Sequence, residues 1–167
     1  MKQEQRKHVG TTIILGLVLA GIGLALGFRT AHAQVPASLL GRWRIQRVLP
    51  AQHQGCWEPE RAQALVGSIL TYEPTRMVWQ GGEIPLQGVL AVSRSLTRQN
   101  FLQEYAVSLD ELGIRTPSVQ EIDLQHEDAD ITGSTTEVPG DTVALAGPGR
   151  IVVSACGVFL EATRLRR

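Results

Sequence analysis

Hydrophobic and polar residues alternate along many short stretches of this chain, as is typical of β-strands. Glycine and proline separate most of these stretches, which indicates turns. The strands that the pattern predicts span residues 39–49, 68–72, 76–80, 85–93, 118–126, 142–146, 150–155 and 158–165. Residues 85–93 are apolar on both faces, so we expect a central, covered strand there. Seven or eight short strands predict a mainly β fold, a small antiparallel barrel.

Two segments break the alternation with helical spacing, residues 58–67 and 97–112. Pro59 suits the first helical position, and Gly67 suits the position just past the end. Thr97 can cap the second helix, and Gly113 would end it. Its apolar face would consist of Phe101, Leu102, Tyr105, Leu109 and Leu112. Such a stripe predicts a face buried in the core rather than a cofactor site.

The N-terminal segment has the organisation of a secretory signal peptide. Basic residues in positions 1–8 precede an uncharged apolar run over residues 9–28, and Ala31-His32-Ala33 forms a small-x-small cleavage pattern. Residues 1–33 would be removed, leaving residues 34–167 as a single exported domain in the periplasm or outside the cell. The alternative is an uncleaved membrane anchor, because 20 uncharged residues are long enough to span a bilayer.

The charge of the predicted mature chain argues against a nucleic-acid partner. Residues 34–167 contain 12 arginines, no lysine and 15 acidic residues, a net charge of about −3. The arginines are scattered and form no basic stripe. Contact with a membrane is expected only through the N-terminal segment, if that segment is retained.

Two cysteines, Cys56 and Cys156, remain in the predicted mature chain. In an oxidising compartment they predict one disulfide, which would close a loop of about 100 residues and stabilise the fold by up to roughly 4.7 kcal/mol. The alternative is two buried free thiols.

The first predicted strand places Trp43, Ile45 and Arg47 on one face by alternation. A charged Arg47 inside a barrel must be paired or must meet a ligand. One hypothesis makes it the anchor for an acidic group of a small apolar molecule. The alternatives are that it lies at the rim, extends to water, or pairs with a carboxylate.

The two ends of the mature chain resemble lipocalins and related calycin barrels. Gly41-Arg42-Trp43 is similar to their Gly-x-Trp motif, and Arg164 resembles the arginine that packs across that tryptophan and closes the barrel floor. A guanidinium stacks well on an indole, so Trp43 and Arg164 are predicted to be structural residues in contact. The resemblance implies a lipocalin-like barrel that binds a ligand, although the helix over residues 97–112 departs from the family.

Residues with other candidate chemistry are few. Tyr72 and Trp79 are candidate ligand-binding residues in the barrel cavity, or plain core residues. The cluster at residues 126–130 has oxygen ligands but lacks calcium-loop spacing, so a solvated acidic loop is expected and no metal site is predicted. Glu121 and Asp123 share one strand face, where solvent exposure would explain them. The sequence lacks the common hydrolase, redox and phosphate-binding motifs, and no cofactor is predicted.

These observations leave three functional hypotheses. The first is an exported protein that binds a small apolar ligand through Arg47, Tyr72 and Trp79. The second is a structural or interaction domain of the cell envelope with a filled barrel, and the third is an enzyme without a recognisable motif. An open apolar interior would favour the first, and a packed interior would favour the second.

Overall fold

The structure is a computed structural model of the whole chain, and it describes residues 35–50, 58–86, 89–125, 139–155 and 157–166. The chain divides into two compact units, Met1–Thr30 and Ala31–Arg167. The first unit lies outside the described residues, so the signal peptide stays a prediction. None of the helices in the described ranges is long and apolar enough to cross a bilayer.

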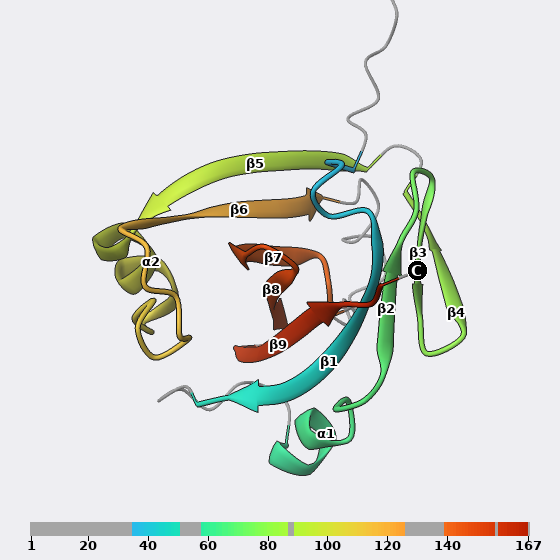
Figure 1. Cartoon of the computed structure of the whole chain (residues 1–167), viewed down its shortest axis with the longest axis horizontal. Helices are drawn as coiled ribbons and strands as arrows, with labels where there is room; N and C mark the ends of the chain where they lie inside the picture. Colours follow the sequence, from blue (N-terminus) through green and yellow to red (C-terminus); the bar gives the residue numbers. More distant parts are fainter. Residues whose placement is uncertain (1–34, 51–57, 87–88, 126–138, 156, 167) are drawn as a thin grey trace, which may run out of the picture. The chain divides into compact units, whose positions relative to one another are not determined.

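Nine antiparallel strands form one curled sheet (Figure 1). Its order is β4-β3-β2-β1-β9-β8-β7-β6-β5. Consecutive strands therefore pair, except β4 and β5, and the first strand pairs with the last. The strands are β1 Gly41–Leu49, β2 Ile69–Tyr72, β3 Arg76–Trp79, β4 Gly82–Pro85, β5 Leu90–Thr97, β6 Ser118–Gln125, β7 Thr142–Gly147, β8 Arg150–Ala155 and β9 Val158–Arg164. The predicted mainly β fold is confirmed, with nine strands in place of seven or eight.

The sheet remains an open half-barrel, and the predicted closed barrel is wrong on this point. Adjacent strands alternate in direction, so the two edge strands of a nine-stranded sheet, β4 and β5, run the same way. Parallel neighbours need a connection of about a dozen residues or more. Only residues 86–89 join β4 to β5, and this connection is too short for the two strands to pair in parallel.

The expected central strand at residues 85–93 is also wrong. This segment divides between β4 and β5, which are the two edges of the sheet. Leu90 is accordingly 52% exposed. An apolar run on both faces is typical of a covered strand, but here Leu86 and Val89 are buried outside any strand.

Two hydrophobic clusters lie on opposite faces of the sheet. The inner cluster fills the curl with side chains that include Trp43, Ile45 and Leu70. The outer cluster includes Phe101 and Phe159, and it joins the outer face of the sheet to α2, Arg98–Tyr105, and to the segment that follows α2. Because both faces are covered over part of the sheet, the fold buries more apolar surface than a single-sided sheet would.

The two helices are shorter than predicted. The first, α1, spans Pro59–Gln63 and begins at the expected proline. Thr97 caps α2 as expected, but the helix ends where Ala106 adopts a left-handed conformation with φ of 52°, well before Gly113. Leu102, expected on the buried face, is 48% exposed. The irregular segment after α2 instead contributes buried side chains, which are Val107, Leu109, Leu112 and Ile114.

Candidate functional site

Trp43 and Arg164 are in contact, as predicted. They are directly paired across β1 and β9, and the guanidinium carbon lies 4.1 Å from the centroid of the indole ring. The indole N–H donates a hydrogen bond of 2.7 Å to the carbonyl of Leu39. The guanidinium also donates to the carbonyls of Leu40 and Ser38. The opening and closing segments of the sheet are therefore joined by stacking and by hydrogen bonds.

Gly41 is required at this contact because the guanidinium crosses directly over it. A Cβ atom at Gly41 would lie 2.8 Å from Nη1 of Arg164, and the residue has a φ of +125°, which disfavours a side chain. The Gly-x-Trp pattern thus has a local physical cause. The glycine makes room for the arginine, and the tryptophan provides the surface on which it stacks.

A groove of about 710 Å³ lies beside this contact, on the surface of the domain. It runs between the start of β1, the end of β2 and the C-terminal end of β9. Its lining residues are Leu40, Gly41, Arg42, Thr71, Tyr72, Glu73, Pro74, Arg164, Leu165 and Arg166. The volume falls within the range of about 300–1,000 Å³ that is common for ligand pockets.

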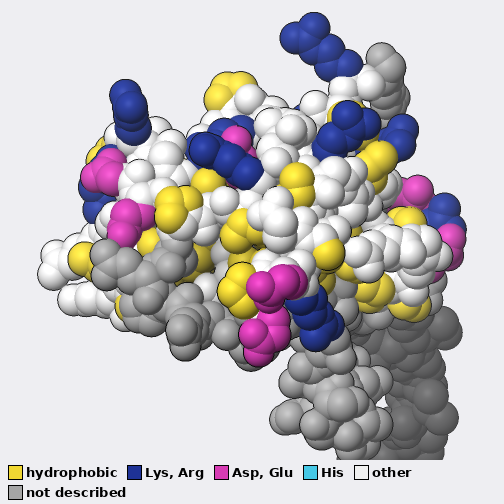
Figure 2. All heavy atoms as spheres, turned by 90° about the horizontal axis from the view of Figure 1, so that it is seen from below, with side chains coloured by type: hydrophobic (Ala, Val, Ile, Leu, Met, Phe, Trp, Pro, Cys, Tyr) yellow, Lys and Arg dark blue, Asp and Glu magenta, His cyan; other side chains and the backbone are white. Residues whose placement is uncertain are grey.

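The charges at the groove are mainly positive. Arg42 and Arg166 are exposed there, and within the described ranges neither side chain forms an ion pair. Glu73 also lines the groove, but its carboxylate accepts a hydrogen bond of 2.7 Å from Arg76. On the face shown in Figure 2, arginines lie beside acidic side chains with apolar residues between them.

Tyr72 is part of tight packing in the curl as well as of the groove wall. Its hydroxyl donates a 2.7 Å hydrogen bond to the carbonyl of Gly140, and burial raises its pKa well above the ordinary value, with a further contribution from Asp141. A Cβ atom at Gly140 would lie 2.6 Å from the Tyr72 hydroxyl and 3.0 Å from the sulfur of Met77. This part of the interior has no room for one more methyl group.

Trp79 lies on the inner side of β3 and packs, half-buried, against the inner cluster. It is paired with Leu70 across β2 and β3. Trp79 does not line the groove, whereas Tyr72 does, so the two residues do not share that surface.

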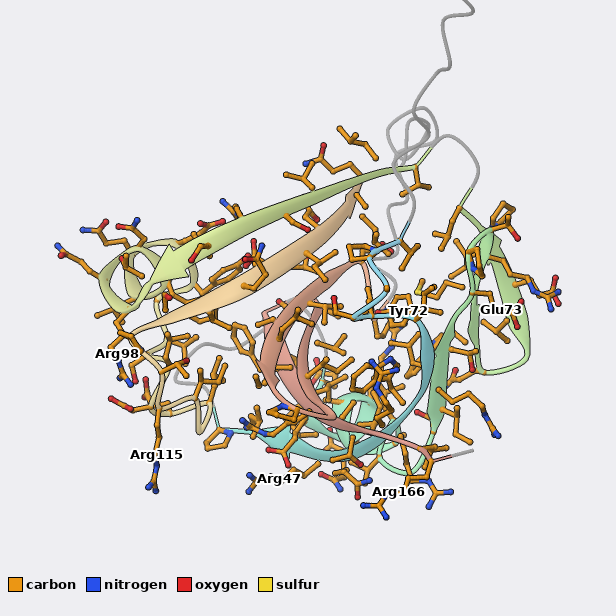
Figure 3. The ribbon with its side chains drawn as sticks, turned by 45° about the horizontal axis from the view of Figure 1, so that its top comes forward. Arg47, Tyr72, Glu73, Arg98, Arg115 and Arg166 are labelled. Carbon is orange, nitrogen blue, oxygen red and sulfur yellow. The ribbon has the colours of Figure 1, made fainter. Side chains whose placement is uncertain are left out.

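The expected inward orientation of Arg47 is wrong. A β-bulge between Ile45 and Arg47 shifts the register with β9 and reverses the alternation after it. The Arg47 side chain is 61% exposed and points away from the curl (Figure 3). It lies 3.0 Å from the carboxylate of Glu161, which is the carboxylate-paired alternative that the sequence left open.

Glu161 is the centre of a small ionic network on the outer face. Burial opposes its charge, but hydrogen bonds from Arg47 and Arg150 outweigh that effect and lower its pKa below the ordinary value. Arg150 also donates to the carbonyls of Leu112 and Gly113. The network thus attaches the segment after α2 to the sheet.

The sequence analysis missed a buried carboxylate. Glu121 is 1% exposed, and its side chain accepts hydrogen bonds of 2.7 Å from Arg94 and 2.6 Å from the hydroxyl of Tyr105. A cavity of about 10 Å³, the size of one water molecule, lies next to it. The strand pattern gave no sign of this burial, because α2 covers an outer face that alternation alone assigns to solvent.

The described ranges contain no group of three or more potential metal ligands. Cys56, Cys156 and His126, together with the acidic cluster that follows His126, lie outside the described residues, so the predicted disulfide stays a prediction. Comparison with known proteins adds no assignment: no family model matches the chain, and neither the curated proteins nor the solved structures gave a match.

Proposed function

We propose that this chain is an exported binding protein of the cell envelope, built on a lipocalin-like half-barrel, and that it binds a small molecule in the groove beside Trp43 and Arg164. The observation that carries the proposal is a groove of 710 Å³ with both apolar and cationic walls. The likeness to lipocalins is supported by the Trp43–Arg164 contact and by the order of the strands.

The ligand position differs from the one that the sequence suggested. Tyr72 fills the curl and bonds to Gly140, and Arg47 lies outside, so neither is available to hold a ligand inside a cavity. The groove offers apolar side chains from Leu40 and Leu165 at the surface instead. Binding at the groove therefore requires no rearrangement of the packed interior.

A second function, an interaction domain with a filled interior, is favoured by the packing around Gly140. It predicts that the protein carries no small molecule. For protein purified from its own cell envelope, the first function predicts a retained small molecule and the second predicts none.

Native mass spectrometry of that protein is the test. We expect a retained small molecule that is lost from a Thr71→Trp variant, because Thr71 lines the groove. A Ser95→Trp variant is the matched control, since Ser95 is exposed on β5 and does not line the groove. Repeated absence of a retained molecule, or retention that is unaffected by Thr71→Trp, would overturn the proposal in favour of the interaction domain.

A further inference from the structure

The groove concentrates positive charge on a domain that is acidic as a whole. Its lining includes three arginines and one glutamate, whereas residues 34–167 carry a net charge of about −3. General basicity therefore does not explain the arginines at this place. The single glutamate is bound to Arg76, which lies outside the groove lining.

The three arginines have different functions. The nitrogens of Arg164 donate to the carbonyls of Leu40 and Ser38, and its plane stacks on Trp43. Arg164 therefore holds the two chain ends together. Arg42 and Arg166 are exposed, and within the described ranges neither side chain forms a hydrogen bond or an ion pair.

We propose that Arg42 and Arg166 bind an anionic group of the ligand, a carboxylate or a phosphate monoester. This inference rests on the function proposed above and specifies the ligand class. A guanidinium presents a planar set of N–H donors that matches the oxygens of both groups. Both arginines line the same groove, so an anion that enters it is attracted by both charges. The apolar part of the ligand would contact Leu40, Pro74 and Leu165, which line the same groove.

The exposure of Arg42 and Arg166 determines how binding responds to salt. Interactions between exposed charges are screened over about 8–10 Å at 0.1–0.15 M salt. Binding of an anionic probe should therefore weaken as salt is added, whereas binding of a neutral probe of the same shape should not.

Calorimetric titration of the full chain with four probes tests the proposal. The probes are 4-phenylbutanoate, phenyl phosphate, 4-phenylbutanol and 4-phenylbutylamine. We expect one or both anions to bind about tenfold more tightly than the alcohol at low salt, since hydrogen bonds to charged groups are stronger than neutral ones. The tighter of the two anions identifies the carboxylate or the phosphate as the ligand group. The amine should bind most weakly.

Variants identify the residues that bind the anionic group. Arg42→Gln and Arg166→Gln should each reduce anion affinity several-fold and leave alcohol binding unchanged. Arg44→Gln is the matched control, because Arg44 is an exposed arginine on the same strand that does not line the groove. It should have no effect.

The outcomes separate this inference from the function on which it rests. If the alcohol binds as tightly as the anions and neither Gln substitution matters, the anion site is wrong while groove binding stands. If no probe binds and the envelope-purified protein carries no small molecule, both proposals fail. An effect of Arg44→Gln equal to that of Arg42→Gln would also overturn the site, because it would indicate attraction by overall charge.

Discussion

The contact between Trp43 and Arg164 makes a quantitative prediction about stability. Replacing Arg164 by alanine removes the stacking interaction, worth about 1 kcal/mol when the indole is buried, as Trp43 is at 1% exposure. It also removes the hydrogen bonds to the carbonyls of Leu40 and Ser38, worth about 1 kcal/mol each at an exposed position. The free energy of unfolding should therefore fall by about 3 kcal/mol, or Tm by about 10 °C.

A double-mutant cycle isolates the stacking. Arg164→Ala, Trp43→Phe and the double variant are unfolded in urea and followed by far-UV circular dichroism, which does not depend on the tryptophan that is being replaced. We expect a coupling energy of about 1 kcal/mol between the two sites. Arg44→Ala, at an exposed arginine on the same strand, should change stability by less than about 0.5 kcal/mol. A coupling energy near zero would refute the role assigned to the pair.

Three further predictions follow from the packing and the charges. Gly140→Ala should cost about 2–4 kcal/mol in urea unfolding, because the new Cβ meets Tyr72 at 2.6 Å and the glycine has a φ of +116°; an alanine variant as stable as the parent would contradict the filled interior. The lowered pKa of Glu161 contributes stability above its ordinary pKa, and this contribution is lost as the pH falls through the lowered pKa. Urea midpoints measured between pH 7 and pH 3 should accordingly fall less in Glu161→Gln than in the parent. Equal slopes of the midpoint against pH in the two proteins would show that the network around Glu161 does not contribute this stability. Tyr105→Phe should cost about 1–3 kcal/mol, because it removes a donor from the buried carboxylate of Glu121; a change below about 0.5 kcal/mol in the same assay would show that the hydroxyl is not needed there.

The local pattern was sufficient for most of the strands. Period-two alternation places β6, β8 and β9 within one or two residues of their observed bounds, because strand formation there depends on nearby side chains and turns. The contact between Trp43 and Arg164 was predicted from the resemblance of Gly41-Arg42-Trp43 and Arg164 to calycin barrels, and the two residues pair across the neighbouring strands β1 and β9.

The site itself depended on long-range structure. Arg47 was placed on the wrong side because a β-bulge, which alternation cannot reveal, reverses the faces after Ile45. The groove also required the end of β2, with Glu73 and Pro74 after it, to lie beside the two chain ends, and no pattern in the sequence predicted that neighbour.

The sequence by itself determined most of the segments that become strands, since strand formation depends on local alternation and turns, and its resemblance to calycin barrels indicated the pair Trp43 and Arg164. Only the tertiary structure decided that the sheet stays open, that Glu121 is buried under α2, and that Arg42 and Arg166 line one groove. The physical reason is that each of these features depends on pairing and packing between residues far apart in the chain.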